Sequence, residues 1–162
     1  MKNGIISRLM LNVYRFGNRI FYNINTPIIR QVLWMLYKFL DVIIVKIVGG
    51  ADIPAQAKIG DNLYLPHNGK GVVIHPTATI GDSVTIYHQV TVGSDGTGNN
   101  GAPVVHDYVF IGVGAKILGR INIGDNAKIG ANAVVLQDVP TNAVAVGIPA
   151  QIILKKVKKQ TI

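Results

Sequence analysis

The 162-residue chain contains no cysteine and no glutamate, and only 7% of its residues are aromatic. Without cysteine there can be no disulfide framework and no thiol chemistry, which fits a protein of a reducing compartment. The first 25 residues are studded with Asn, Arg and Lys and lack a compact apolar segment with a cleavage site. We therefore expect no secretory signal peptide.

Charge is distributed unevenly along the chain. Sixteen Lys and Arg oppose eight Asp, which gives a net charge of +8. Seven of the cations lie before residue 47, where Asp41 is the single acidic residue, and four lie at 155–159. A basic chain can indicate nucleic-acid binding, but the motifs of such proteins are missing here and the positive charge sits at the two ends. We expect no nucleic-acid partner.

Aliphatic residues recur every six positions through most of the chain. Neither a helix, with its period of 3.6, nor one uninterrupted strand produces this spacing. Short strands joined by turns do, and such repeats must stack on one another to bury their apolar side chains. The large aliphatic positions are Ile53, Ile59, Leu65, Ile74, Ile80, Ile86, Val92, Val105, Ile111, Ile117, Ile123, Ile129 and Val135. A second series lies four residues after most of these: Ala57, Leu63, Ala78, Val84, Val90, Val109, Ala115, Ile121, Ala127, Ala133 and Val139.

The repeat resembles the hexapeptide-repeat acyltransferases, which fold as a left-handed parallel β-helix of triangular coils. The resemblance is strongest to the serine acetyltransferase branch, through the segments DIPAQAKIG, HNGKGVVIHPTATIGDSVTI, QVTVGSDGTGNNGAP, GVGAKILG and GANAVVLQDVP. It implies a mainly β fold and a homotrimer, because the acyl-donor groove of this family lies between two subunits. We expect an N-terminal helical segment at 1–49, a β-helix domain at 50–153 and a basic tail at 154–162.

The segment 26–48 is predicted to be a helix, with Thr26 as its cap and Pro27 in the first turn. Arg30, Lys38 and Asp41 fall within an arc of about 80° on a helical wheel, and the remaining surface is apolar. The apolar face is expected to pack on the β-helix or on sister subunits, or else to lie on an anionic membrane surface. A transmembrane span is a third alternative. We expect a cytoplasmic protein, which the membrane alternative would place at the inner face of the cell membrane.

Among the four histidines, His67 stands out because the six-residue period is broken around it by three residues. Breaks in a rigid scaffold often carry function. His75 and His106 each follow a large aliphatic residue and are expected at solvated corners. A Gly-rich loop lies within the segment QVTVGSDGTGNNGAP, residues 89–103. His88 lies directly below this loop in coil order and is a candidate substrate contact.

The resemblance assigns roles to two residues. A histidine at the place of His67 is the general base of the family, and Asp52, fifteen residues earlier, matches the aspartate that orients it. A neutral imidazole suits this task because it can take the proton of an alcohol as the oxygen attacks a thioester. A backbone N–H of the Gly-rich loop would stabilise the oxyanion. No metal is expected.

Acetyl-CoA is the acyl donor that the resemblance implies. Ala115 and Ala133 match small residues along the pantetheine arm in the family, and the residues near them are Gly93, Ser94, Gly112, Gly114 and Lys116. The candidates for binding the CoA phosphates are Lys116, Lys128, Lys155 and Lys156. As an alternative, the small residues merely suit tight coil turns.

Two positions depart from the serine acetyltransferase pattern. Pro66 stands where that family has an Asp before the catalytic His, and Ala102 stands where it has a second His; both lost groups contact the amino-acid acceptor. We therefore predict an O-acetyltransferase acting on a sugar hydroxyl, closest in build to small exopolysaccharide and capsule O-acetyltransferases such as the colanic acid type. The alternatives are a serine O-acetyltransferase, a catalytically silent scaffold, and a carbonic-anhydrase-like relative with histidine metal ligands shared between subunits.

Overall fold

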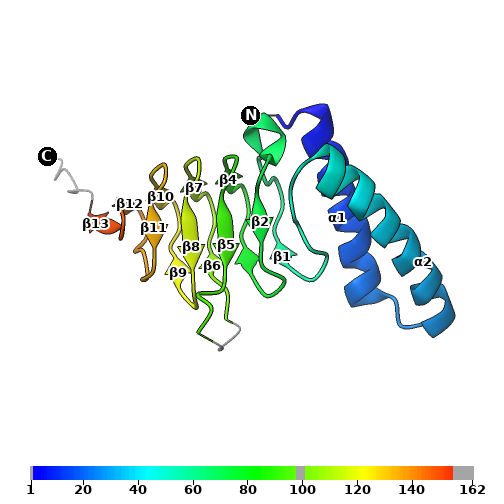
Figure 1. Cartoon of the computed structure of the whole chain (residues 1–162). Coiled ribbons are helices and arrows are strands. Elements are labelled where there is room, and N and C mark those ends of the chain that lie inside the picture. The colour runs from blue at the N-terminus through cyan, green and yellow to red at the C-terminus, as the bar shows by residue number, and fades with distance from the viewer. Residues whose placement is uncertain (1, 98–100, 155–162) are drawn as a thin grey trace, which may run out of the picture.

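The computed structural model, which describes residues 2–97 and 101–154, consists of a helical hairpin followed by a parallel β-helix (Figure 1). Helix α1 spans Ile5–Asn23, α2 spans Pro27–Leu40, and a π-helix, η1, continues α2 over Asp41–Val48. The strands are β1 (Lys58–Ile59), β2 (Val73–Ile74), β3 (Thr79–Ile80), β4 (Thr85–Ile86), β5 (Thr91–Gly93), β6 (Val104–Val105), β7 (Phe110–Ile111), β8 (Lys116–Leu118), β9 (Asn122–Ile123), β10 (Lys128–Ile129), β11 (Val134–Val135), β12 (Val144–Val146) and β13 (Gln151–Ile153).

The strands form three sheets, which are the three faces of a prism. Their orders are β1-β3-β6-β9, β2-β5-β8-β11 and β4-β7-β10-β12-β13, and all described pairs are parallel except β12 with β13. Lys116 pairs with Val134, eighteen residues further on, so one coil contains three hexapeptides. The predicted stack of short parallel strands is confirmed.

The interior of the prism holds both predicted aliphatic series, and no member of either is more than 9% exposed. Burying such a side chain stabilises the fold by about 1.5–3 kcal/mol. At the corners the chain turns sharply through residues in the left-handed conformation, among them Asn62, Asn126 and Asn132. Asn adopts this conformation more readily than most residues, which explains its frequency in the repeats.

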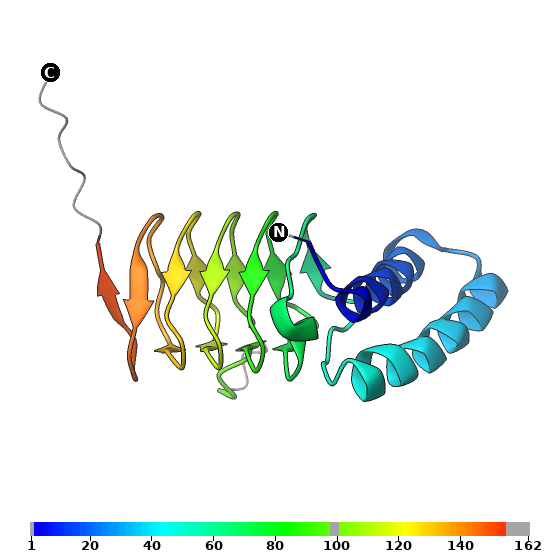
Figure 2. The ribbon, with the colours of Figure 1, turned by 90° about the horizontal axis from the view of Figure 1, so that it is seen from above.

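Helix α1 covers the open end of the first coil, as Figure 2 shows from above. The Tyr14 hydroxyl donates to the carbonyl of Ala57 over 2.8 Å and accepts from the N–H of Ile59 over 3.1 Å. Arg15 donates to the carbonyl of Ile59 over 2.6 Å. The helix thus pairs backbone groups that the end of the β-helix would otherwise leave open.

Helix α2 begins as predicted, with Thr26 at the N-cap position and Pro27 after it, although the Thr26 side chain makes no capping hydrogen bond. The side of α2–η1 that is buried carries Tyr37, Asp41 and Val45. Tyr37 accepts a hydrogen bond from the N–H of Ala55, and burial, with a smaller contribution from Asp41, raises the pKa of Tyr37 to about 12.

The apolar surface of this helix packs inward only in part: Leu33, Trp34, Leu40 and Ile44 are partly buried against the core, whereas Ile28, Val32, Met35 and Phe39 are exposed. Of the predicted polar arc only Asp41 is buried, whereas Arg30 and Lys38 are exposed. None of the helices in the described ranges is both long and apolar enough to cross a membrane.

Candidate active site

The coil is interrupted between β1 and β3. Lys58 pairs with Thr79, twenty-one residues further on, so three residues more than one coil must be accommodated. They form the short 3-10 turn η2, Pro66–Gly69, in which His67, Asn68 and Gly69 all have φ between 53° and 62°. Three consecutive left-handed residues mark a distortion of the backbone, unlike the single left-handed Asn residues at the regular corners.

The distortion leaves His67 exposed and brings it to His88. The two rings meet edge to face with centroids 5.1 Å apart, and the Tyr87 ring lies 6.2 Å from that of His67. The predicted base and the predicted substrate contact therefore lie side by side, on successive coils. His88 Nδ1 is buried and has no hydrogen-bond partner in the described protein. Leaving such an atom unpaired costs about 1–3 kcal/mol.

Asp52 has a different partner from the one predicted. Its backbone pairs with Val72 and Ile74, just beyond the distortion, but its Oδ1 lies 3.6 Å from Lys46 Nζ. No hydrogen bond or ion pair joins Asp52 to His67 within residues 2–97 and 101–154. Lys46 was not singled out by sequence reasoning, because its approach to Asp52 depends on how the hairpin lies against the first coil.

His75 and His106 occupy the corners where they were expected. His75 Nδ1 lies 3.0 Å from Thr77 Oγ1, and His106 is exposed. In the part of the chain that the structure describes, no group of three or more His, Cys, Asp or Glu residues is placed to hold a metal ion.

The small residues predicted along the acyl-donor arm fall into two groups. A Cβ on Gly112 would lie 2.7 Å from the N of Ala131, and one on Gly114 would overlap Asn132 Oδ1. Ala115 and Ala133 are fully buried in the prism. Packing between coils therefore explains these four positions without a ligand.

Gly93, at the end of β5, is different. A Cβ there would lie 3.6 Å from Thr91 Cγ2 and 3.8 Å from Leu118 Cδ2, which are ordinary van der Waals distances. Its φ is not positive either, so the fold gives no reason for glycine. Gly93 is followed by the half-exposed Ser94 and the Gly-rich loop. Gly93 itself is buried, although no contact within the chain requires it to lack a side chain.

The candidate phosphate partners differ in availability. Lys116 Nζ donates to the carbonyl of Gln89 over 2.6 Å, whereas Lys128 is exposed. Lys155 and Lys156, like most of the predicted basic tail and residues 98–100 of the Gly-rich loop, lie outside the described residues.

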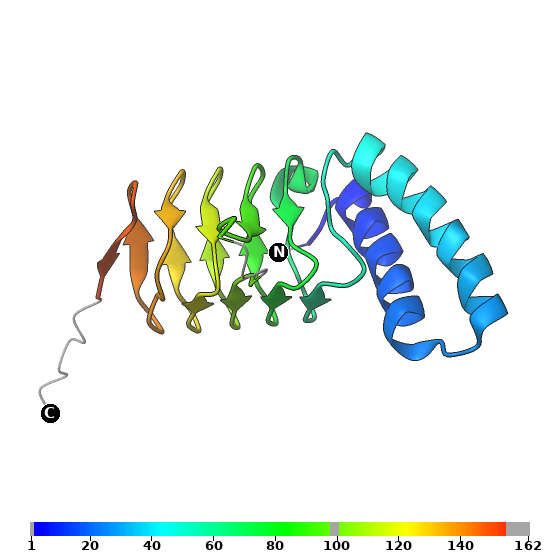
Figure 3. The ribbon, with the colours of Figure 1, turned by 60° about the horizontal axis from the view of Figure 1, so that its bottom comes forward.

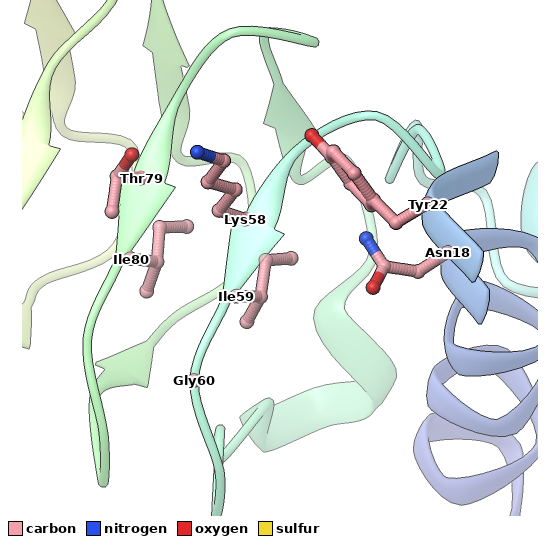
Figure 4. A pocket seen from close by; sticks show the side chains of 7 residues that line it. All are labelled: Asn18, Tyr22, Lys58, Ile59, Gly60, Thr79 and Ile80. Carbon is pink, nitrogen blue, oxygen red and sulfur yellow. The ribbon is translucent and has the colours of Figure 1, made fainter.

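A groove of about 390 Å³ lies between α1 and strands β1 and β3 (Figure 4). It is lined by Asn18, Tyr22, Lys58, Ile59, Gly60, Thr79 and Ile80. Asn18 donates to the carbonyl of Ala55 over 2.7 Å and the Tyr22 hydroxyl to that of Gln56 over 2.7 Å. These two hydrogen bonds hold the hairpin on the coil.

Comparison with known proteins adds to this geometry. Residues 102–137 match the family model for the bacterial transferase hexapeptide (six repeats). The chain is 51% identical over 109 residues to a serine acetyltransferase of Mycobacterium tuberculosis, covering 67% of this chain and 47% of the relative. It is 50% identical over 111 residues to a serine acetyltransferase of Helicobacter pylori, covering 68% of this chain and 64% of the relative. The chain thus spans about half to two thirds of the length of these relatives.

Solved structures extend the likeness to the helices. Soybean serine acetyltransferase complexed with serine superposes with a TM-score of 0.79 at 37% identity, covering 93% of this chain and 58% of that one. The Neisseria gonorrhoeae serine acetyltransferase in complex with serine gives 0.74 at 36% identity, covering 88% and 54%. The predicted left-handed β-helix is confirmed by this match. The chain therefore belongs to the hexapeptide-repeat acyltransferase family and has serine acetyltransferases among its relatives.

Proposed function

We propose that the chain is an acetyl-CoA-dependent O-acetyltransferase with His67 as its general base. The observation that carries the proposal is the position of His67: exposed, at the three-residue break of the coil, and in contact with His88. The relatives named serine acetyltransferase support the reaction class.

The chemistry needs one proton to move twice. His67 takes the proton of the acceptor hydroxyl as its oxygen bonds to the acetyl carbon, and a backbone N–H of the Gly-rich loop stabilises the oxyanion. The carbon–sulfur bond then breaks, and the imidazolium returns the proton to the thiolate of CoA. In this proposal Asp52 orients His67, for which its half-exposed carboxylate must turn from Lys46 toward the imidazole.

For the acceptor we infer serine, because the relatives carry that name and two of the solved ones contain serine. This ranks the sugar hydroxyl predicted from the sequence second. One observation still favours a sugar: Pro66 and Ala102 are buried and offer neither a carboxylate nor an imidazole to an amino acid. A lipid-linked or capsule sugar would be the acceptor in that case.

We also propose a homotrimer with acetyl-CoA between coils of neighbouring subunits. The exposed Lys128 and the lysines at 155 and 156 are the cations offered to the CoA phosphates. Gly93 would face the arm of the donor, since no contact within the chain requires glycine there.

Replacing His67 with Asn should lower kcat/KM for acetyl-CoA consumption by about 10²–10⁴, because the acceptor hydroxyl loses its base. The matched control is His106→Asn, which changes an exposed corner histidine and should leave the rate unchanged. Both variants should unfold at the wild-type temperature. A fully active His67→Asn enzyme would reject the assignment of the base.

An acceptor panel distinguishes the two candidate substrates. We expect acetyl-CoA to be consumed with L-serine and mass spectrometry to find O-acetylserine, while monosaccharides and nucleotide sugars stay unmodified. Acetylated sugar without acetylated serine would establish the second candidate instead. If acetyl-CoA is consumed with none of the acceptors, the proposed function as a whole is contradicted.

Gly93→Ala should raise KM for acetyl-CoA by about tenfold, since a methyl group in an occupied groove costs about 1–3 kcal/mol. Its unfolding temperature should not change, because the added Cβ meets no atom of the chain closer than 3.6 Å. Gly112→Ala is the contrasting variant and should lower the unfolding temperature. An unchanged KM in Gly93→Ala would show that the arm does not pass this residue.

A further inference from the structure

Helix α2 and η1 carry a continuous apolar surface that faces away from the β-helix. Ile28, Val32, Met35, Phe39 and Val42 follow the alternating four- and three-residue spacing of one helix face, and their exposure ranges from 45% to 77%. A second row, 40–68% exposed, runs beside them: Ile29, Leu36, Ile43 and Ile47. These nine residues are called the α2–η1 apolar face.

This face is the outermost surface of the hairpin. Figures 1 and 3 show α1 between α2 and the strands, and the buried residues of α2–η1, Tyr37, Asp41 and Val45, are on the opposite side. A helical segment of this length extends about 33 Å at 1.5 Å per residue. Leaving so long an apolar strip in water is unfavourable, and contiguous exposed patches of this kind mark interaction surfaces.

The exposed charge around the face is positive. Arg30, Lys38 and Lys46 are exposed on the same helical segment, and Arg8 and Arg19 are exposed on α1. The one acidic residue in 2–51 is Asp41, which is 4% exposed; Lys46 Nζ lies 3.7 Å from it and 3.6 Å from the half-exposed Asp52 that follows the hairpin. Arg30 and Lys38 lie on the side of the helix that carries Asp41 and not beside the strip, so a matching partner is apolar where the strip lies and carries net negative charge.

The tip of the hairpin combines a cation with aromatic rings. A groove of about 510 Å³ is lined by Phe21, Asn25, Pro27, Arg30, Gln31 and Trp34. The Arg30 guanidinium lies 5.7 Å from the centroid of Phe21, and Lys38 Nζ lies 5.6 Å from that of Trp34. Trp and long cationic side chains of this kind are enriched where a protein meets the headgroup region of a bilayer.

We propose that the α2–η1 apolar face docks on the surface of an anionic lipid bilayer, with the hairpin lying in the interface and the β-helix outside it. The apolar strip enters the boundary between headgroups and acyl chains, and the exposed cations of the hairpin are attracted by the lipid phosphates. A second copy of the chain fits the face less well. The hairpin of each copy carries the exposed cations Arg8, Arg19, Arg30 and Lys38 against the single buried carboxylate of Asp41, so two hairpins have the same net charge and repel each other.

Sedimentation of the full-length protein with vesicles tests the proposal. We expect binding to phosphatidylcholine vesicles that contain phosphatidylglycerol, weaker binding to phosphatidylcholine alone, and loss of the difference at high salt. Val32→Glu with Phe39→Glu should weaken binding by about tenfold or more, because two apolar side chains that insert into the bilayer in this proposal are replaced by charges. The matched control is Asn12→Glu with Asn23→Glu, which adds the same charge at exposed positions of α1 and should change binding less than about threefold.

Circular dichroism and unfolding temperature should be the same for both double variants and the wild type, since all four substituted side chains are exposed. Light scattering of the protein without lipid measures its particle size and tests whether the face instead binds a second copy of the chain. Equal loss of binding in both double variants, or no binding of the wild type to anionic vesicles, would overturn the proposal. The proposal would also be overturned if the particle size of the wild type fell on introducing Val32→Glu with Phe39→Glu, because the face would then join copies of the chain.

Discussion

The stacking of aliphatic side chains inside a narrow prism is the constraint on which the rest of the structure depends. Two of every six residues point inward, and in both series they are at most 9% exposed. Because each coil is held by the coil before it, a regular coil contains eighteen residues, as between β8 and β11. Any residue in excess of that number must leave the prism.

That constraint places the candidate site. The three extra residues between Leu65 and Ile74 cannot enter the core, so the backbone turns outward through three left-handed residues and carries His67 into solvent. The rigid coil beside it supplies His88 at a fixed position. The regular coils thus fix the position of His88, and the three-residue break exposes His67, the proposed base.

Much of the fold follows from the sequence because the side chains that point into the prism recur every six residues. The same reasoning could single out His67, since an interruption is visible as soon as the period is known. It could not show that Asp52 lies by Lys46, because that contact depends on how the hairpin meets the first coil. Nor could it show which way α2 faces: a helical wheel finds an apolar side but does not say what packs against it.

The small residues show a similar limit. Gly93, Gly112 and Gly114 look alike in the sequence, yet two are required by a neighbouring coil and one is not. Only the distances from a hypothetical Cβ separate a glycine that packing demands from one that packing does not demand. The acceptor is harder still, because Pro66 and Ala102 indicate what has been lost and not what replaces it.

The central claim is that the break in the repeat serves the reaction and not the fold. Deleting residues 68–70 joins His67 to Gly71 and restores the six-residue step between Leu65 and Ile74. The shortened chain should retain its β-helix, judged by circular dichroism and by an unfolding temperature no lower than that of the wild type, and should no longer consume acetyl-CoA. A deletion variant that fails to fold, or one that folds and keeps its activity, would contradict the account.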